Sequence, residues 1–466
     1  MASASGQSVA LEGRLAGLSL RRQVAALAVW PFLELVLHAL VGFMDTAIAG
    51  RLDDPAALDA IGVAAYVGWL VGMLHNAVGI GAGALIARAV GGGRTTLANA
   101  ALGQAVLIAL AWGLITAGAI ALLAPWIAAI FSLPPGTHEM AVVYLRVLAV
   151  GVTFNALMMA GNAALRSAGD TRTPFLVMAL TNAVNVGASV LFVFGPKPWG
   201  GYGVAGIAAG TVVAWGVGML LSLGVLASGK ARVRLRKRRL RPHAHTARRI
   251  VRVAWPSLVE NSGMWIGNAL VGTIVGLLIA RSGQDGLMGA HIIAIRVESL
   301  SFLPGVALGI AAATLMGQYL GAGDAEMARR ATHVCWGAAV VLMGAMGLLF
   351  IALPEPIAAL LAPGEAVASV REMAVPLLRI AGTIQVFFAT YLVLSQALRG
   401  AGDTLGPMVI TYSSTFGVRL PAAYVLGLVL DLGLTGVWIG LCGELIVRGG
   451  VYAWRFHRGA WRRIEV

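Results

Sequence analysis

Hydrophobic stretches of about twenty residues or more follow one another along almost the whole chain of 466 residues, separated by short segments with charges, prolines and glycines. A helix needs about 20 apolar residues to cross the hydrocarbon core of a bilayer. Backbone groups exposed to lipid must be satisfied within their own segment, so each stretch is expected to be an α-helix. Division at the polar segments predicts twelve spans, near residues 23–50, 58–88, 95–123, 139–164, 173–195, 203–228, 252–280, 286–319, 327–353, 371–397, 406–430 and 435–457.

The composition agrees with a membrane protein. Hydrophobic residues make up 59% of the chain, charged residues 12%, and the mean hydropathy is +0.84. A soluble protein carries about 25% charged residues, so this chain does not belong in water. Its two cysteines, Cys335 and Cys442, both lie in apolar stretches. They indicate buried packing residues rather than a disulfide framework.

The basic residues are distributed unevenly, which predicts the orientation of the chain. Of the 34 Lys and Arg residues, eleven lie between Lys230 and Arg252, in a segment flanked by spans. If the N-terminus is cytoplasmic, 25 of the 34 fall in inside segments and six at outside ends. Cytoplasmic segments are enriched in Lys and Arg, so both termini are expected in the cytoplasm. The basic segment is expected to face membrane lipids with anionic headgroups and not nucleic acid, despite the net charge of +14.

The chain also repeats itself. AALRSAGDTRTP (163–174) recurs as QALRGAGDTLGP (396–407), an offset of 233, and GIGAGALIARAVGGGR (79–94) recurs as GIAAATLMGQYLGAGD (309–324), an offset of 230. Trp30-Pro31 similarly returns as Trp255-Pro256. Matches at nearly constant offsets indicate a duplication.

Each copy carries six spans, an even number, so both copies are expected to insert the same way up. A pseudo-two-fold axis along the membrane normal then relates the two lobes. The predicted organisation is a cytosolic tail (1–22), a first lobe (23–229), a basic cytoplasmic linker (230–251), a second lobe (252–457) and a second cytosolic tail (458–466).

Asp45 places a carboxylate inside the first span, in MDTAIAG. A charge at membrane depth is unfavourable by roughly 2.5–3.5 kcal/mol on insertion scales unless it is paired, protonated or bound to a cation. At about 1.5 Å per helical residue, Asn185, Ser189 and Thr211 are expected at a similar depth. The four side chains are therefore candidates for a shared proton or small-cation site. The alternative is that Asp45 only hydrogen-bonds a neighbouring helix.

Glu34, His38 and Asp45 are spaced by four and seven residues, so they share one stripe of a helix. This spacing allows a proton relay along the stripe. It equally allows a Glu34–His38 pair that neutralises itself for packing. The spacing does not decide between them.

The second half offers Glu260 and Glu298 at similar predicted depths in the seventh and eighth spans. A buried carboxylate that faces a cavity attracts a cationic substrate or a coupling ion, and both residues are therefore candidate cargo contacts. The alternative for Glu260 is an internal partner such as Arg296 or Arg419. Glu444 and Arg448 are four residues apart in the last span, which indicates a structural ion pair.

Several of these motifs resemble a known family. VGFMDTAIAG in the first span, LRSAGDT and LRGAGDT after the fourth and tenth spans, and LGAGD after the eighth are similar to motifs of the multidrug and toxic compound extrusion (MATE) transporters. The resemblance covers roughly residues 25 to 455. It implies an inner-membrane antiporter that expels cationic, amphipathic compounds in exchange for protons or sodium.

The resemblance also implies roles for single residues. In the family, an Asp of the first helix is accompanied by an Asn of the fifth helix, an acid four positions later and a Thr of the sixth helix. Asn185 and Thr211 match this pattern, whereas Ser189 departs from it. Glu260 in WPSLVEN matches a glutamate that family members often carry in the seventh helix.

The departure at Ser189 favours protons over sodium. Sodium prefers several oxygen ligands including carboxylates. The segment 384–396 of the tenth span also lacks an aspartate that some sodium-coupled members carry. A single buried carboxylate suits a proton, because burial favours the protonated form.

The sequence thus predicts an all-α, twelve-span, two-lobe antiporter for small organic cations, with no catalytic residues, no metal ligands and no cofactor, and functional as a monomer. One alternative is a lipid-linked saccharide flippase, which would line its cavity with basic residues. The other is a membrane-embedded, prenyltransferase-like enzyme, which would need paired acidic metal-binding motifs.

Overall fold

The computed structural model describes residues 11, 15–52, 55–131, 134–361 and 368–464. Helices make up 88% of the structure, and the described residues contain no strand. The chain divides into two compact units. Unit 1 includes Leu18–Ala28 and Val259–Val466, and unit 2 includes Val29–Leu258. The predicted all-α membrane fold is confirmed, whereas the predicted lobe boundaries stay a prediction.

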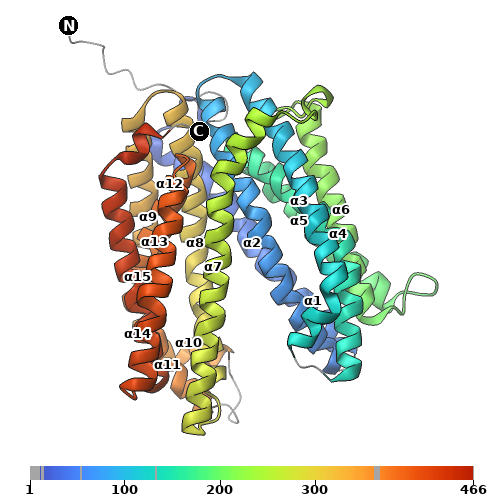
Figure 1. The fold of residues 1–466 in the computed structure, drawn as a ribbon, viewed down its shortest axis with the longest axis vertical. Coiled ribbons are helices and arrows are strands. Elements are labelled where there is room, and N and C mark those ends of the chain that lie inside the picture. The colour runs from blue at the N-terminus through green and yellow to red at the C-terminus, as the bar shows by residue number, and fades with distance from the viewer. Residues whose placement is uncertain (1–10, 12–14, 53–54, 132–133, 362–367, 465–466) are drawn as a thin grey trace. The chain divides into compact units, whose positions relative to one another are not determined.

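Unit 2 is a bundle built around α4 (Figure 1). Its closest helix pairs are α3 with α4, α5 with α6, α4 with α6, and α2 with α4. Small residues such as Ala141, Ala149 and Gly151 line the buried side of α4, which lets neighbouring backbones approach. Unit 2 contains most of α1 (Leu20–Ala49), then α2 (Pro55–Gly91), α3 (Thr95–Ile130), α4 (Pro135–Ser167), α5 (Arg172–Phe194), α6 (Gly203–Ser228) and the start of α7 (Ala244–Ser282).

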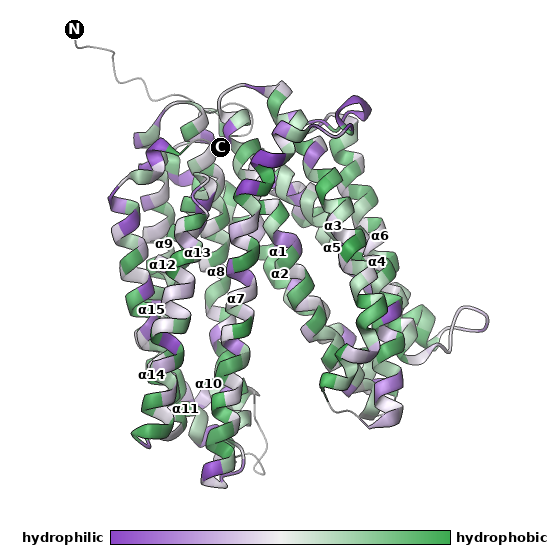
Figure 2. Ribbon diagram, viewed as in Figure 1, coloured by the Kyte–Doolittle hydropathy of each residue, from purple (hydrophilic) through white to green (hydrophobic). Residues whose placement is uncertain are grey.

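Unit 1 packs α8, α9, α12 and α15 against one another. Figure 2 shows that hydrophobic residues dominate its helices, although hydrophilic positions interrupt α7 and α15. Unit 1 contains the rest of α7, then α8 (Leu287–Gly321), α9 (Ala325–Ala352), the short α10 (Pro354–Leu361), α11 (Ala368–Thr383), α12 (Gln385–Gly400), α13 (Leu405–Ser414), η5 (Thr415–Arg419), α14 (Leu420–Tyr424), η6 (Val425–Val429) and α15 (Gly433–His457).

Ten described helices are long and apolar enough to cross a membrane. The predicted tenth span is α11 and α12, which meet at an angle of 56°. At this break Gln385 is buried, and its Nε2 donates to the carbonyl of Ala381, 3.1 Å away. The predicted eleventh span is an unbroken run of helical residues, 405–429, in which η5 and η6 are π-helical. Neither the bend nor the π segments were predicted.

The duplicated motif builds the same turn twice. The amide of Gly169 donates to Arg166 O and that of Asp170 to Leu165 O, both at 2.9 Å. In the second copy, Gly402 and Asp403 repeat this pattern with Arg399 and Leu398, again at 2.9 Å. Gly169 and Gly402 have φ of 92° and 88°, a conformation that favours glycine.

The same pair of helices crosses closely in each half. A Cβ on Gly83 of α2 would lie 2.7 Å from Ser167 Oγ of α4. In the second half the glycine lies on the other helix of the pair. A Cβ on Gly400 of α12 would meet the backbone oxygen of Ala313 in α8. Residues 83 and 313, and 167 and 400, are equivalent in the repeat. Each crossing therefore pairs a glycine with a slightly larger residue.

Gly400→Ala is expected to destabilise the protein by about 1–3 kcal/mol, the usual effect of overpacking. The methyl group would meet backbone atoms of α8, which cannot move aside as a flexible side chain would. Thermal unfolding of the purified protein in detergent measures the change. Gly337→Ala in α9 is the control, because a Cβ there meets no atom within 4 Å. Equal unfolding temperatures for both variants would contradict the close crossing.

The basic linker lies against the start of α3. Gln104 Nε2 donates to the carbonyls of Arg239 and Arg241, at 3.3 and 2.8 Å, and its Oε1 accepts from the amide of His243 at 2.9 Å. A Cβ on the neighbouring Gly103 would lie 2.2 Å from Arg239 O. The linker is thus held by specific contacts within unit 2.

Candidate functional site

Helices α1 and α5 run side by side in a fixed register. The rings of Trp30 and Phe175 lie 5.3 Å apart, and Asn182 Nδ2 donates to Leu37 O at 2.9 Å. Both contacts join residues 145 positions apart, so the two helices run in the same direction. Extending this register places Asp45 opposite Val190, which follows Ser189 and lies about one turn beyond Asn185.

Asn185 and Thr211 are brought together by α5 and α6. Asn185 Nδ2 donates to Thr211 Oγ1 at 3.0 Å, and the Thr211 hydroxyl donates to Ile207 O at 3.2 Å. Ser189 Oγ also donates to Ile207 O, at 3.5 Å. All three polar side chains are buried. The structure records no direct hydrogen bond from Asp45 to any of them among the described residues.

Tyr144 of α4 is a further polar residue in this part of unit 2. Tyr144 is buried in the core cluster that also contains Ile48 of α1 and Ile207 of α6. Sequence reasoning missed Tyr144, because a tyrosine in an apolar span gives no signal beyond its own hydroxyl group.

Two oxygen atoms of this site are buried without a hydrogen-bond donor among the described protein groups: Oδ1 of Asp45 and Oδ1 of Asn185. Buried acceptors are normally satisfied, and an orphaned one commonly marks a functional site. A proton or a small cation bound to Asp45 would satisfy its Oδ1. The described residues also place no Lys or Arg in an ion pair with Asp45.

Ser189 lies where α5 and α6 cross closely. A Cβ on Gly210 of α6 would meet the hydroxyl and the backbone of Ser189.

Glu34 has a partner that the sequence did not suggest. Its carboxylate lies 2.8 Å from Arg166 Nη1, which comes from the LRSAGD end of α4. The His38 side chain is exposed. Because Arg166 already neutralises Glu34, a Glu34–His38 pair is not needed for packing. A relay through His38 stays a prediction.

Glu260 is paired with Arg399, not with the suggested Arg296 or Arg419. Its Oε1 lies 2.7 Å from Arg399 Nη2 and accepts from Thr411 Oγ1 at 2.8 Å. Only 1% of the Glu260 side chain is exposed. Its second oxygen, Oε2, is buried without a hydrogen-bond donor among the described residues. The signal for Arg399 was present in the sequence, because it repeats the position of Arg166 in the duplicated motif.

Glu444 binds two guanidinium groups inside unit 1. Its oxygens lie 2.9 Å from Arg419 Nη2 and 2.6 Å from Arg448 Nε, which confirms the predicted Glu444–Arg448 pair. Arg419 ends the π segment η5, a type of distortion that recurs at functional sites. Further bonds join Arg419 to Asn268, and Arg448 to Ser414 and Thr415.

Glu298, the second predicted cargo contact, is half-buried, and no ion pair to its carboxylate is recorded among the described residues. Arg296, two residues earlier on α8, is exposed and therefore points elsewhere. Of the two predicted cargo contacts, Glu260 is the one with a recorded arginine partner among the described residues.

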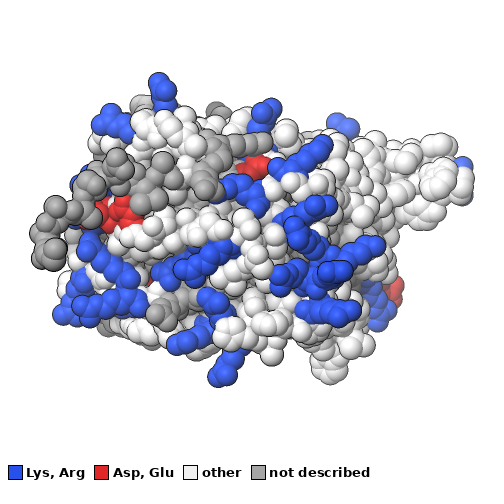
Figure 3. Space-filling view, turned by 90° about the horizontal axis from the view of Figure 1, so that it is seen from above, with Lys and Arg blue, Asp and Glu red and all other residues white. Residues whose placement is uncertain are grey.

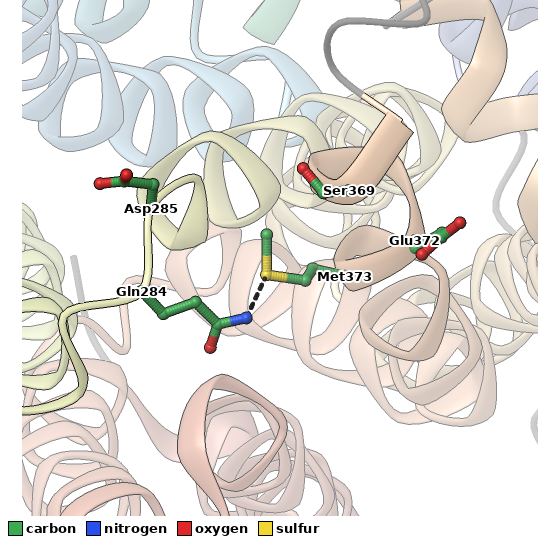
Figure 4. Close-up of a pocket in the computed structure, with 5 residues that line it drawn as sticks. All are labelled: Gln284, Asp285, Ser369, Glu372 and Met373. Atoms are coloured by element: carbon green, nitrogen blue, oxygen red, sulfur yellow. Dashed lines mark hydrogen bonds between the residues drawn. The ribbon is translucent and has the colours of Figure 1, made fainter.

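A pocket of about 430 Å³ opens between the loop after α7 and the start of α11 (Figure 4). Gln284 Nε2 lies 3.2 Å from Met373 Sδ inside it. The carboxyl groups of Asp285 and Glu372 point away from this contact, in opposite directions. They do not converge on a common ligand position.

Comparison with known proteins adds three findings. The MatE family profile matches residues 32–191 and 256–425. The chain is 31% identical over 447 residues to a probable multidrug resistance protein NorM of Thermotoga maritima, covering 96% of this chain and 94% of the relative. It is 24% identical over 441 residues to an uncharacterized transporter, YisQ, of Bacillus subtilis, covering 93% of each.

Two solved structures share the fold. A MOP superfamily transporter from Pyrococcus furiosus, described as having a binding pocket of reverse polarity, superposes with a TM-score of 0.87 at 20% identity, covering 96% of this chain and 98% of that one. A MATE protein in the bent conformation superposes with a TM-score of 0.85 at 22% identity, covering 95% and 97%. At these identities the likeness concerns the fold alone.

Proposed function

We propose, from the premise that this chain belongs to the MatE family, that it exports cationic amphipathic compounds by antiport against protons. Membership of this family makes the chain a transporter and not an enzyme, which sets aside the prenyltransferase-like alternative. The relative from Thermotoga maritima is named for multidrug resistance, which supports drugs as the exported class.

One observation carries the proposal for coupling: Asp45 is a carboxylate in the apolar helix α1, its Oδ1 is buried without a donor, and no described Lys or Arg forms an ion pair with it. Such a group must bind a proton or a cation to be stable at membrane depth. Asn185, Thr211 and Ser189 supply polar neighbours at the same level.

In the proposed cycle, drug enters an inward-open state while Asp45 is ionised, and the two lobes then rock to the outward-open state. A proton from outside neutralises Asp45, and the drug leaves. The return step carries the proton inward. Glu34 and His38 are proposed to help the proton reach or leave Asp45 along their shared stripe.

Protons fit this site better than sodium does. The site offers one carboxylate, with a serine at position 189 where a second acid would bind sodium. A proton needs only the one acceptor.

For the cargo, we propose contacts with Glu260 and Glu298, as expected for a positively charged compound. Glu260 forms an ion pair with Arg399, whereas no ion pair of Glu298 is recorded among the described residues. A basic residue such as Arg399 would suit the pyrophosphate of a lipid-linked saccharide, which is the alternative cargo.

We further propose a multi-pass protein of the inner membrane that works as a monomer, with both termini in the cytoplasm. Figure 3 looks onto the face that carries the linker, where Lys and Arg are numerous and Asp and Glu are few. Such a face suits the cytoplasmic leaflet and its anionic lipids.

The proposal is tested by drug efflux from proteoliposomes under an imposed pH gradient or an imposed sodium gradient. We expect the pH gradient alone to drive efflux and the sodium gradient alone to have no effect. Efflux driven by sodium alone would overturn proton coupling. Transport of a lipid-linked saccharide, with no movement of organic cations, would overturn the assigned cargo.

A further inference from the structure

A histidine outside the proposed coupling site lies buried in the middle of unit 2. His75 of α2 is buried, and each of its ring nitrogens contacts a polar side chain of another helix. Nδ1 lies 3.3 Å from Asn155 Oδ1 on α4, and Nε2 lies 3.1 Å from Thr116 Oγ1 on α3. Each of the three residues lies near the middle of a helix that is long and apolar enough to cross a membrane. One imidazole thus links three helices at mid-membrane depth.

The surroundings of His75 favour a neutral imidazole. Helices α3 and α6, which pack against α2, contain no charged residue, and on α2 and α4 the nearest Lys, Arg, Asp or Glu is at least nine residues away along the helix. A buried imidazolium ion without a counter-charge is strongly unfavourable. A neutral imidazole has one donor and one acceptor. Because Oδ1 of Asn155 faces Nδ1, Nδ1 carries the hydrogen, and Nε2 accepts from the Thr116 hydroxyl.

The bond from His75 leaves the amide nitrogen of Asn155 turned away. No described group accepts a hydrogen bond from Asn155 Nδ2, and this atom is not among the buried atoms without a partner. The residue as a whole is half-buried. Its two N–H groups are therefore accessible, unpaired donors at a depth where lipid offers no acceptor, which is unfavourable unless water or a polar ligand reaches them.

Asn155 does not lie on the lipid side of α4. The exposed stripe of this helix runs through Val143 and Val150. Asn155 follows Val150 by five residues, which turns it about 140° away from that stripe. Arg166, eleven residues after Asn155, shares its side of the helix and bonds Glu34 of α1 at 2.8 Å. The free amide therefore lies on the side of α4 that faces α1.

The same ion pair gives the depth of Asn155 relative to Asp45. Helices α1 and α5 run in the same direction, and α4 runs in the opposite one because a short turn joins it to α5. Asp45 lies eleven residues after Glu34, and Asn155 lies eleven residues before Arg166. Both side chains therefore reach a similar depth. A ligand that bonds the Asn155 amide would lie at the level of the proposed proton site.

We infer that Asn155 is a cargo contact and that His75 is the positioning residue behind it. The buried imidazole holds the amide so that its N–H groups face a hydrogen-bond acceptor of the exported compound, such as a carbonyl or ether oxygen. This inference rests on the proposed export function and names a feature of the substrates: besides a positive charge, the favoured compounds carry an oxygen acceptor. Carboxylates take the charge, and Asn155 takes the oxygen.

Three cations separate this contact from recognition of charge. Rhodamine 6G carries ester and ring oxygens, ethidium carries amine donors but no oxygen, and tetraphenylphosphonium carries no hydrogen-bonding group. Transport of each is measured with the full-length protein in proteoliposomes under the same pH gradient. The readout is the KM for rhodamine 6G or ethidium divided by the KM for tetraphenylphosphonium, because a general structural defect affects numerator and denominator alike.

Asn155→Leu should raise the KM ratio for rhodamine 6G by about two- to tenfold, the effect of one lost neutral hydrogen bond. The ratio for ethidium should change less. Val150→Leu, on the exposed stripe of the same helix, is the control and should keep both wild-type ratios. If Asn155→Leu does not fold, Asn155→Ala takes its place, since it removes the amide without adding bulk.

Two substitutions of His75 test its positioning role. The amide nitrogen of an asparagine overlays Nδ1 of a histidine, so His75→Asn can still donate to Asn155 and should keep the wild-type ratio for rhodamine 6G. The amide of a glutamine overlays Nε2 instead and reaches Thr116, so His75→Gln should raise the ratio as Asn155→Leu does. Equal ratios for the two folded His75 variants would overturn the positioning role.

Two further outcomes bear on the cargo contact. An unchanged rhodamine 6G ratio in the folded Asn155 variant would overturn it. A rise for ethidium that equals or exceeds the rise for rhodamine 6G would also do so, as expected if the Thr116 hydroxyl donates to the Trp112 carbonyl, 2.9 Å away, and the Asn155 amide is turned over. Failure of the wild-type protein to transport any of the three cations would refute the proposed function itself.

Discussion

Asp45→Asn is expected to abolish the exchange of drug for protons, down to the level of protein-free liposomes. The amide has the shape of the carboxyl group but cannot take up a proton at physiological pH, so the outside proton can no longer neutralise this position. The measurement is the change of internal pH that follows addition of drug to proteoliposomes. Drug binding and thermal unfolding should stay near wild type.

Asp59→Asn is the matched control for this result, because Asp59 is an exposed acid in the first turns of α2 of the same unit. It should exchange drug for protons at the wild-type rate. Full exchange by folded Asp45→Asn protein would end the coupling role of Asp45.

Glu444→Gln is expected to have the largest effect on stability. The substitution leaves Arg419 and Arg448 inside unit 1 without the carboxylate that both now contact, at 2.9 and 2.6 Å. Removal of one partner from a buried ion pair destabilises proteins by about 3–5 kcal/mol. The variant should therefore show a much lower unfolding temperature in detergent, or fail to yield monodisperse protein.

The control for Glu444→Gln is Glu326→Gln, because Glu326 also pairs with more than one arginine but lies exposed. Arg329, Arg330 and Arg462 lie 2.7, 3.3 and 4.0 Å from its carboxylate. Exposed ion pairs contribute about 0–1 kcal/mol. Similar unfolding temperatures for both variants would show that burial of Glu444 does not set its importance.

Much of the fold follows from the sequence because lipid imposes simple rules. A helix must be long enough to cross the bilayer, and its backbone groups must form hydrogen bonds within their own segment. These two requirements predict where the helices lie. The bend between α11 and α12 does not follow, since it depends on close packing at Gly382 and Gly347 and on Gln385 satisfying a freed carbonyl. The π segments within 405–429 could not be predicted either, because the pattern of hydrophobic residues is the same as in an α-helix.

The candidate site was partly predictable. The number of residues from each helix end predicted that Asn185 and Thr211 lie at a similar depth. In the structure a hydrogen bond joins them. The arginine partners of Glu34 and Glu260 were not found, because they lie 132 and 139 residues away and are chosen by packing. They could have been suspected from the duplication, which places an arginine at equivalent positions next to each glycine turn.

The central claim is that drug leaves in exchange for protons that bind Asp45. Its most direct test records drug efflux and internal pH together, in sodium-free proteoliposomes of the wild-type protein and of Asp45→Asn. The account predicts that wild-type efflux requires the pH gradient and is matched by proton entry, and that the variant shows neither. Efflux that continues in the wild type after a proton ionophore collapses the gradient, at a rate shared by the variant, would contradict it.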